Sequence, residues 1–249
     1  MLIHVVEKFV IKPKFWNIPE DNPVCLSEFG DYRHDMINDD YLCRNNCLIY
    51  KDQKNHSLYV AGILGHPDAL KDARSNPRMS RRFSEISDQI SSRTVQYSDI
   101  CPDYQYCEHK KCKSLILVAD HVFGLPSLIC SECGGLIAKY RLSLSKQTNS
   151  MLWSWERQHD AIDSLSSLCL DYESWADGEI YNIRSKINQL GLSVGRNISD
   201  GLNRPVYYLF DTGENVLHDC PQCSAPLKPS LFSKRHDECS ICKILLGNS

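Results

Sequence analysis

Two cysteine pairs near the C-terminus constrain this chain more than any other feature. Cys220-Pro-Gln-Cys223 is followed, after fifteen residues, by Cys239-Ser-Ile-Cys242. Two residues between cysteines allow a tight turn that aims both sulfurs at one ion, and a second pair completes a tetrahedron with Zn–S distances of about 2.3 Å. Because a closed four-sulfur shell leaves no position for water, such a site holds structure and does no chemistry. We therefore predict a C-terminal zinc ribbon that binds one Zn²⁺.

A second, looser cysteine group lies in the middle of the chain. Cys107-Glu-His-Lys-Lys-Cys112 is followed, after seventeen intervening residues, by Cys130-Ser-Glu-Cys133 and two glycines. Glycine can supply the positive φ that turns backbone amides toward the sulfurs. Strand-like segments between the pairs favour a zinc-ribbon-like β-hairpin with a second zinc ion. The predicted ligands are Cys107, Cys112, Cys130 and Cys133, with His109 as the alternative to Cys107, since His109 and Cys112 also show the two-residue spacing.

The chain contains thirteen cysteines, most of them clustered in pairs, and this clustering indicates metal binding. Its formal net charge is −3. The apolar N-terminus lacks a basic start and is broken by Glu7 and Lys8, so it is not a secretory signal by pattern. No apolar run approaches the ~20 residues that span a bilayer. We therefore expect a cytoplasmic chain without a membrane segment, in a compartment where clustered cysteines bind metal rather than form disulfides. Buried apolar thiols are expected at the remaining cysteines: Cys25, Cys43, Cys47, Cys101 and Cys169.

Residues 1–100 show the pattern of a mixed α/β unit. Their apolar runs indicate strands over residues 2–11, 47–51, 58–64 and 94–97, and helices over residues 27–37 and 77–91. The order β-α-β-β-α-β predicts a ferredoxin-like sandwich.

The C-terminal part begins, after a polar linker at residues 145–150, with helical periodicity. Apolar residues recur at steps of three and four over residues 151–170 and again from about residue 177 to residue 202. We expect two long antiparallel helices, then a strand over residues 205–210 that leads to Cys220. The predicted fold is α+β, in three domains: a ferredoxin-like unit (1–100), a zinc-ribbon-like segment (101–145), and a helical hairpin with the C-terminal ribbon (146–249).

Basic residues gather at two places that suggest phosphate contacts. The candidate nucleic-acid contacts are Arg78, Arg81 and Arg82 on the second predicted helix, and Lys228, Lys234 and Arg235 in the ribbon loop. The alternative is a solvated helix face, because the segment from Glu28 to Asp40 is just as acidic. That acidic run is itself a candidate protein-docking surface. The negative net charge argues against a nucleic-acid clamp formed by the whole chain.

Two apparent catalytic patterns lie in the predicted helices. Gly191-Leu-Ser193-Val-Gly195 fits a nucleophile elbow, but that turn requires a strand ending at the serine, and here the helical period runs through it. His159, next to Asp160 and four residues before Asp163, is expected on the wet face of its helix. Neither pattern supports an enzyme, and no small-molecule substrate site is evident.

Several segments together resemble a known family. They are Cys130-Ser-Glu-Cys133-Gly-Gly, Tyr140-Arg-Leu, the run from Leu152 to Leu165, Pro205-Val-Tyr-Tyr-Leu, and the C-terminal cysteine pairs. This combination resembles a bacterial, mostly proteobacterial, family of uncharacterised zinc-ribbon proteins described as candidate nucleic-acid binders. The resemblance implies a zinc ribbon at Cys220, Cys223, Cys239 and Cys242.

Three hypotheses for function follow from the whole sequence. The first is a nucleic-acid-binding module. The second, suited by the negative net charge, the aromatic content and the lack of a catalytic constellation, is a protein-binding adaptor or inhibitor such as an immunity protein that caps a bacterial toxin. The third is an enzyme whose site is formed by residues distant in sequence.

Overall fold

The computed structural model of the chain divides into two compact units. It describes residues 2–12, 27–42, 48–52, 54–55, 57–87, 89–101, 105–119, 125–168, 171–213, 215–230, 232 and 236–247. Unit 1 comprises residues 1–106, 122–126 and 136–140, and unit 2 comprises residues 107–121, 127–135 and 141–249. The segment from 101 to 145, expected as a domain of its own, thus contributes to both units.

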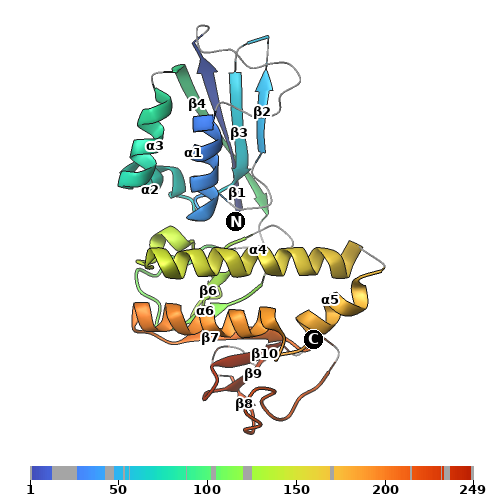
Figure 1. Cartoon of the computed structure of the whole chain (residues 1–249). Coiled ribbons are helices and arrows are strands. Elements are labelled where there is room, and N and C mark those ends of the chain that lie inside the picture. The colour runs from blue at the N-terminus through green and yellow to red at the C-terminus, as the bar shows by residue number, and fades with distance from the viewer. Residues whose placement is uncertain are drawn as a thin grey trace. The chain divides into compact units, whose positions relative to one another are not determined.

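Unit 1 has the predicted ferredoxin-like order of elements (Figure 1). Its four strands pair antiparallel in the order β2-β3-β1-β4. The strands are β1 (Leu2–Ile11), β2 (Leu48–Asp52), β3 (Ser57–Ile63) and β4 (Ile90–Cys101), and the helices are α1 (Ser27–Asn38), α2 (Ala69–Ser75) and α3 (Pro77–Ser87). The short helix α2 was not expected. The N-terminus of α3 follows a familiar pattern, because Pro77 stands at its first position and the Asn76 side chain accepts the Arg78 N–H at 2.9 Å.

The core of unit 1 contains charged groups that are paired. Along β1, Val5, Glu7, Phe9 and Ile11 share the buried face, as the two-residue period of a strand requires. The Glu7 carboxylate accepts the Tyr32 hydroxyl at 2.9 Å and pairs with Arg93. Burial of this charge is tolerated because its oxygens are bonded.

A second buried ion pair ties a distant segment into unit 1. Lys139 Nζ lies 3.0 Å from an Asp40 carboxylate oxygen, and the other carboxylate oxygen accepts the Lys139 backbone N–H at 3.0 Å. Both residues are buried. Residues 136–140 follow Cys133 in the sequence, so this pair holds in unit 1 a segment that is distant in sequence from Asp40.

Unit 2 is built on a mixed sheet of six strands in the order β6-β5-β7-β10-β9-β8. Its strands are β5 (Leu115–Leu117), β6 (Leu128–Cys130), β7 (Val206–Asp211), β8 (Lys228–Pro229), β9 (His236–Cys239) and β10 (Ile244–Gly247). β5, β7 and β10 are parallel neighbours, and the other pairings are antiparallel. The two predicted hairpins therefore belong to one sheet, and β7 joins them. Sequence patterns did not indicate this arrangement.

Three helices belong to unit 2, where two long ones were predicted. They are α4 (Lys146–Leu168), α5 (Glu173–Ile180) and α6 (Lys186–Leu202), with α4 and α6 running side by side (Figure 1). The expected linker at 145–150 is wrong, because Ser145 Oγ accepts the Thr148 N–H at 3.0 Å and α4 begins at once. Among the described residues, no helix has the length and hydropathy that crossing a bilayer requires.

The prediction of one helix from residue 177 to residue 202 is also wrong. The chain leaves helical geometry at residues 181–185, and Ser185 starts α6 by accepting the Asn188 N–H at 3.3 Å. The Asn188 side-chain amide donates to the carbonyls of Glu179, Ile180 and Asn182 at 2.8–3.0 Å, which satisfies the end of α5. Apolar spacing alone does not reveal such a break, because the buried residues on both sides keep the same period.

Candidate metal centres

The C-terminal cysteines converge as predicted. The Sγ atoms of Cys220, Cys223, Cys239 and Cys242 all lie within 4.8 Å of one another, and the Cys223 and Cys239 sulfurs are 3.6 Å apart. A tetrahedral shell with metal–sulfur bonds of about 2.3 Å has edges of about 3.8 Å, whereas a disulfide requires about 2.05 Å. The spacing therefore fits four ligands around one ion.

The backbone around these sulfurs has a form that the central group repeats. The Cys220 N–H donates to the Ala225 carbonyl at 2.8 Å, and the Cys220 carbonyl accepts the Ser224 N–H at 2.8 Å. In the central group, the Cys130 N–H likewise donates to the Gly135 carbonyl at 2.9 Å, and the Cys130 carbonyl accepts the Gly134 N–H at 2.8 Å. The fourth residue after the first cysteine has positive φ in three pairs: Gly134 (70°), Ser224 (58°) and Lys243 (56°). This left-handed residue wraps the backbone around the sulfurs, as expected for Gly134 but not for the other two.

Backbone amides also act directly on the thiols. Burial by itself would raise the pKa of Cys130, but the N–H groups of Glu132 and Cys133 oppose it and lower that pKa to about 7. The pKa of Cys223 is lowered, chiefly by the N–H of Ala225. Metal ligation requires thiolates, so amides that stabilise negative sulfur favour it.

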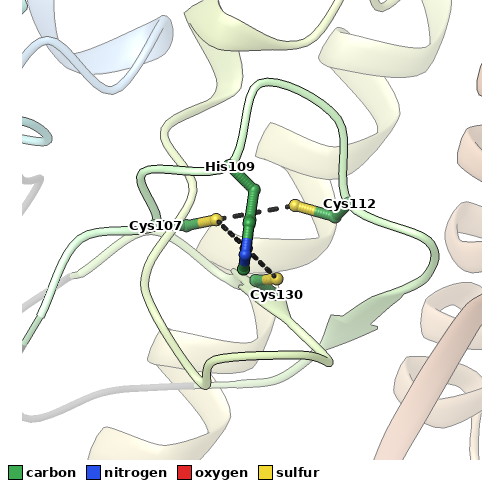
Figure 2. A group of neighbouring side chains, drawn as sticks. All are labelled: Cys107, His109, Cys112 and Cys130. Atoms are coloured by element: carbon green, nitrogen blue, oxygen red, sulfur yellow. Dashed lines mark hydrogen bonds between the residues drawn. The ribbon is translucent and has the colours of Figure 1, made fainter.

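The central group gathers a histidine with its cysteines. Figure 2 shows the imidazole of His109 between Cys107 and Cys130, and these side chains and Cys112 have ligand atoms within 4.8 Å of one another. His109 Nδ1 is 3.5 Å from both neighbouring sulfurs, and the Cys107 and Cys112 sulfurs are also 3.5 Å apart. Zinc bonds of about 2.0–2.1 Å to nitrogen and about 2.3 Å to sulfur imply an N–S edge of about 3.6 Å. The imidazole is thus at ligand distance.

Four donors consequently meet at the central position: Cys107, His109, Cys112 and Cys130. The predicted ligand Cys133 is not one of these four, although its thiol, with those of Cys112 and Cys130, adds to the effect of burial in raising the pKa of Cys107. Three sulfurs, on Cys107, Cys112 and Cys130, are buried, while His109 and Cys133 are exposed. The prediction treated His109 as a substitute for Cys107. The structure instead brings both together, so His109 and Cys133 are the two candidates for the fourth position.

Residues outside the cysteine group hold the central loop in place. The Arg141 guanidinium donates to the carbonyl of Cys107, and Arg204 donates to the carbonyl of Cys112 at 3.4 Å. The hydroxyls of Ser114 and Ser131 are 2.5 Å apart and buried. Cys130 ends β6 and Cys239 ends β9, so the two groups stand toward opposite ends of the same six-stranded sheet.

The predicted phosphate contacts on α3 are paired with carboxylates. Arg82 lies 2.8 Å from Asp35 and 3.0 Å from Glu85. Arg78 also pairs with Asp35, and Arg81 lies 3.2 Å from Glu85. Carboxylates of α1 and of α3 itself thus compensate these arginines. Between the two C-terminal cysteine pairs, Lys228 stands opposite Glu238 in the β8–β9 register, and Lys234 and Arg235 lie outside the described residues.

Other sequence expectations have mixed outcomes. His159 does not lie on a wet face: it is 6% exposed, and its ring packs edge-on against Trp155 at 5.7 Å. Ser193 lies inside α6, so the elbow motif has no strand before it. Four of the leftover cysteines lie outside the described residues: Cys25, Cys43, Cys47 and Cys169.

Comparison with known proteins identifies one domain. Residues 109–210 match DUF2310, a domain of unknown function. This match contains His109, three of the central cysteines, α4 to α6 and most of β7. No curated protein matches the chain.

Solved structures resemble part of the chain weakly. An antibiotic biosynthesis monooxygenase is 19% identical, with a TM-score of 0.32, over 40% of this chain and 99% of its own. Rv0793 from Mycobacterium tuberculosis is 14% identical, with a TM-score of 0.30, over 41% and 98%. SnoaB, a cofactor-independent oxygenase from Streptomyces nogalater, is 11% identical, with a TM-score of 0.31, over 40% and 92%. Likeness at this level says nothing about what this chain does.

Proposed function

We propose that this chain is a non-enzymatic zinc protein with two structural metal sites that works as a protein-binding module. The C-terminal ion is held by Cys220, Cys223, Cys239 and Cys242. The central ion is held by Cys107, Cys112 and Cys130 with a fourth donor. The observation that carries the proposal is the convergence of each group at ligand spacing on one sheet. Zinc suits these donors because soft thiolates and imidazole are its preferred ligands.

Closed coordination argues for a structural role. Four protein donors fill a tetrahedral shell, so neither ion has a position for water or substrate. The C-terminal group is followed by β10, in which Ile244, Leu245 and Leu246 are buried. This strand pairs with β7, the centre of the sheet. Zinc at the C-terminal group would therefore hold β9 and β10 against β7, since binding energy at such a site is folding energy.

A protein partner is favoured over nucleic acid by the charges. Phosphate binding requires uncompensated cations, and the arginines of α3 face Asp31, Asp35, Asp39 and Glu85. An exposed aromatic surface lies elsewhere, at α5, where Tyr172 and Trp175 are 57% and 53% exposed. Tyrosine and tryptophan are enriched where protein interfaces concentrate their binding energy. An adaptor or an inhibitor, such as an immunity protein that caps a toxin, fits this surface.

Affinity capture with paired variants tests the function. The zinc-loaded chain, Trp175→Ala and Tyr97→Ala are used as baits, because Tyr97 is an equally exposed aromatic residue (59%) in unit 1. We expect one stoichiometric protein partner that survives nuclease treatment, is lost with Trp175→Ala and is retained with Tyr97→Ala. Recovery of nucleic acid with an affinity that falls steeply with salt would instead support the nucleic-acid module.

A further inference from the structure

A cavity of about 230 Å³ opens within unit 2, at the carboxyl ends of its parallel strands. It is lined by residues that follow β5 (Val118 and Ala119), by the second half of β7 and by the last residue of β10. Helices α4, α5 and α6 contribute the remaining walls. In sheets with parallel strands covered by helices, ligands bind outside these carboxyl ends. The position therefore suits a ligand, and it is separate from both cysteine groups.

The charge on the cavity wall is negative. Asp163 on α4 and Asp211 at the end of β7 line it, and none of the described lining residues is a lysine or an arginine. Within the part of the chain that the structure describes, no basic side chain forms an ion pair with either carboxylate. Asp211 is held by accepting the Gly213 N–H at 2.8 Å. Burial raises the pKa of Tyr181, which lines the cavity, and the negative charges of Asp211, Asp177 and Asp163 raise this pKa further.

The other walls are aromatic and already ordered. Tyr208 is 2% exposed and donates its hydroxyl to Asn188 at 2.6 Å. Asn188 is fixed in turn by the carbonyls at the end of α5. His159, Tyr181 and Phe210 complete a lining that is mostly carbon, with a few polar groups. Such a largely preformed, mostly apolar lining is typical of small-molecule sites.

We propose that this cavity binds a small organic cation: a protonated amine or quaternary ammonium with a compact apolar body. Carboxylates attract the charge, and the tyrosine faces attract it through their ring quadrupoles. The volume corresponds to roughly eight waters and lies below the roughly 300–1,000 Å³ of drug-sized sites, so the ligand is small. A metal ion is a poor occupant, because the cysteine groups are the only sets of three or more ligand atoms that meet among the described residues.

This inference is independent of the zinc proposal and of the α5 surface. It would hold for an enzyme or an adaptor, and its failure would leave the metal centres unaffected. Its readout is ligand affinity, whereas the proposed function is read from partner capture.

Calorimetric titration of the zinc-loaded full chain tests the proposal with three probes of similar shape. Phenethylamine is cationic at neutral pH, 2-phenylethanol is neutral and 3-phenylpropionate is anionic. We expect binding of the cation alone. Asp163→Asn and Asp211→Asn should each weaken it about tenfold or more, whereas Asp200→Asn, an equal charge change on an exposed part of α6, should not.

Two results would overturn the proposal. Equal binding of the neutral probe would show an apolar cavity without charge selection, and absence of binding by all three would show no site for this class. Zinc content and near-ultraviolet circular dichroism of each variant establish that it is folded. A variant that fails this check is replaced by Ala119→Leu, which fills the cavity without changing charge and should abolish binding of the cation.

Discussion

Replacing Gly191 by alanine tests how closely α6 approaches its neighbours in unit 2. A Cβ at this position would lie 2.8 Å from Tyr208 Cε2 and 2.9 Å from Trp155 Nε1. Ordinary contacts begin near 3.4 Å, so the rings would have to shift by about 0.6 Å. Both rings are buried, and the Tyr208 hydroxyl is bonded to Asn188. Neither ring can give way cheaply.

The magnitude follows from two opposing terms. Alanine is favoured over glycine inside a helix by about 1 kcal/mol, while overpacking a filled core costs about 1–3 kcal/mol. Gly201→Ala, in the same helix, gains only the first term, since a methyl group at residue 201 would meet no atom within 4 Å. The difference between the two variants isolates the packing cost, because helix propensity cancels. It should be about 1–3 kcal/mol.

Urea unfolding of the zinc-loaded variants, followed by circular dichroism, measures this difference. Gly201→Ala should shift the midpoint upward and Gly191→Ala should lie below it by the stated amount. Gly195→Ala, whose nearest contacts are 3.8 and 3.9 Å, should behave like Gly201→Ala. Equal stability of Gly191→Ala and Gly201→Ala would refute the close approach of α6 to Trp155 and Tyr208.

Three further predictions concern the two cysteine groups and unit 1. Ser224→Gly should stabilise the C-terminal site by about 1 kcal/mol, seen as slower zinc loss to a chelator, since φ is 58° there. Lys139→Met should destabilise unit 1 by about 3–5 kcal/mol in urea, because it removes the ammonium group that offsets the buried Asp40 charge, and adding Asp40→Asn should recover part of that loss. Cys133→Ser should weaken zinc binding at the central group more than His109→Ala does, because the backbone turn that contains Cys133 repeats the turn that contains Cys223. A larger effect of His109→Ala would assign the fourth position to His109.

The ferredoxin-like order was predictable because local signals agreed with the tertiary structure. The strand expected over residues 2–11 is β1 (Leu2–Ile11), and its alternation continues through buried Glu7. Glu7 looks polar in sequence, yet Tyr32 and Arg93 satisfy it. Pairing between distant residues of this kind has no local signature.

The break between α5 and α6 shows the same limit. Apolar periodicity continues from Ile180 to Ile187, but a single side chain, Asn188, closes one helix and helps to open the next. An asparagine inside a helical pattern is a weak signal, because its effect depends on the carbonyls it meets. The Gly191-Leu-Ser193-Val-Gly195 motif lies inside α6 and forms no nucleophile elbow. Gly191 instead allows close packing, because the Trp155 and Tyr208 rings leave no room for a Cβ there.

Cysteine spacing located the four C-terminal cysteines and three of the four central donors that converge, since the spacing of nearby ligands is encoded locally. It did not reveal that β7 joins the groups in one sheet, which depends on parallel pairing between segments far apart in the chain. It also did not place His109 beside Cys107, because both occupy a loop whose shape is fixed by Arg141 and Arg204. The negatively charged cavity is likewise assembled from separate elements that only the tertiary structure brings together.

Elemental analysis of the purified chain tests the central claim most directly. We predict two zinc ions per chain, one lost in Cys239→Ser and one lost in Cys130→Ser, with Cys25→Ser as a cysteine control that retains both. The two ligand variants should also lose stability, because each site contributes its binding energy to folding. A chain that carries no zinc, or that keeps two zinc ions in both ligand variants, would contradict the account.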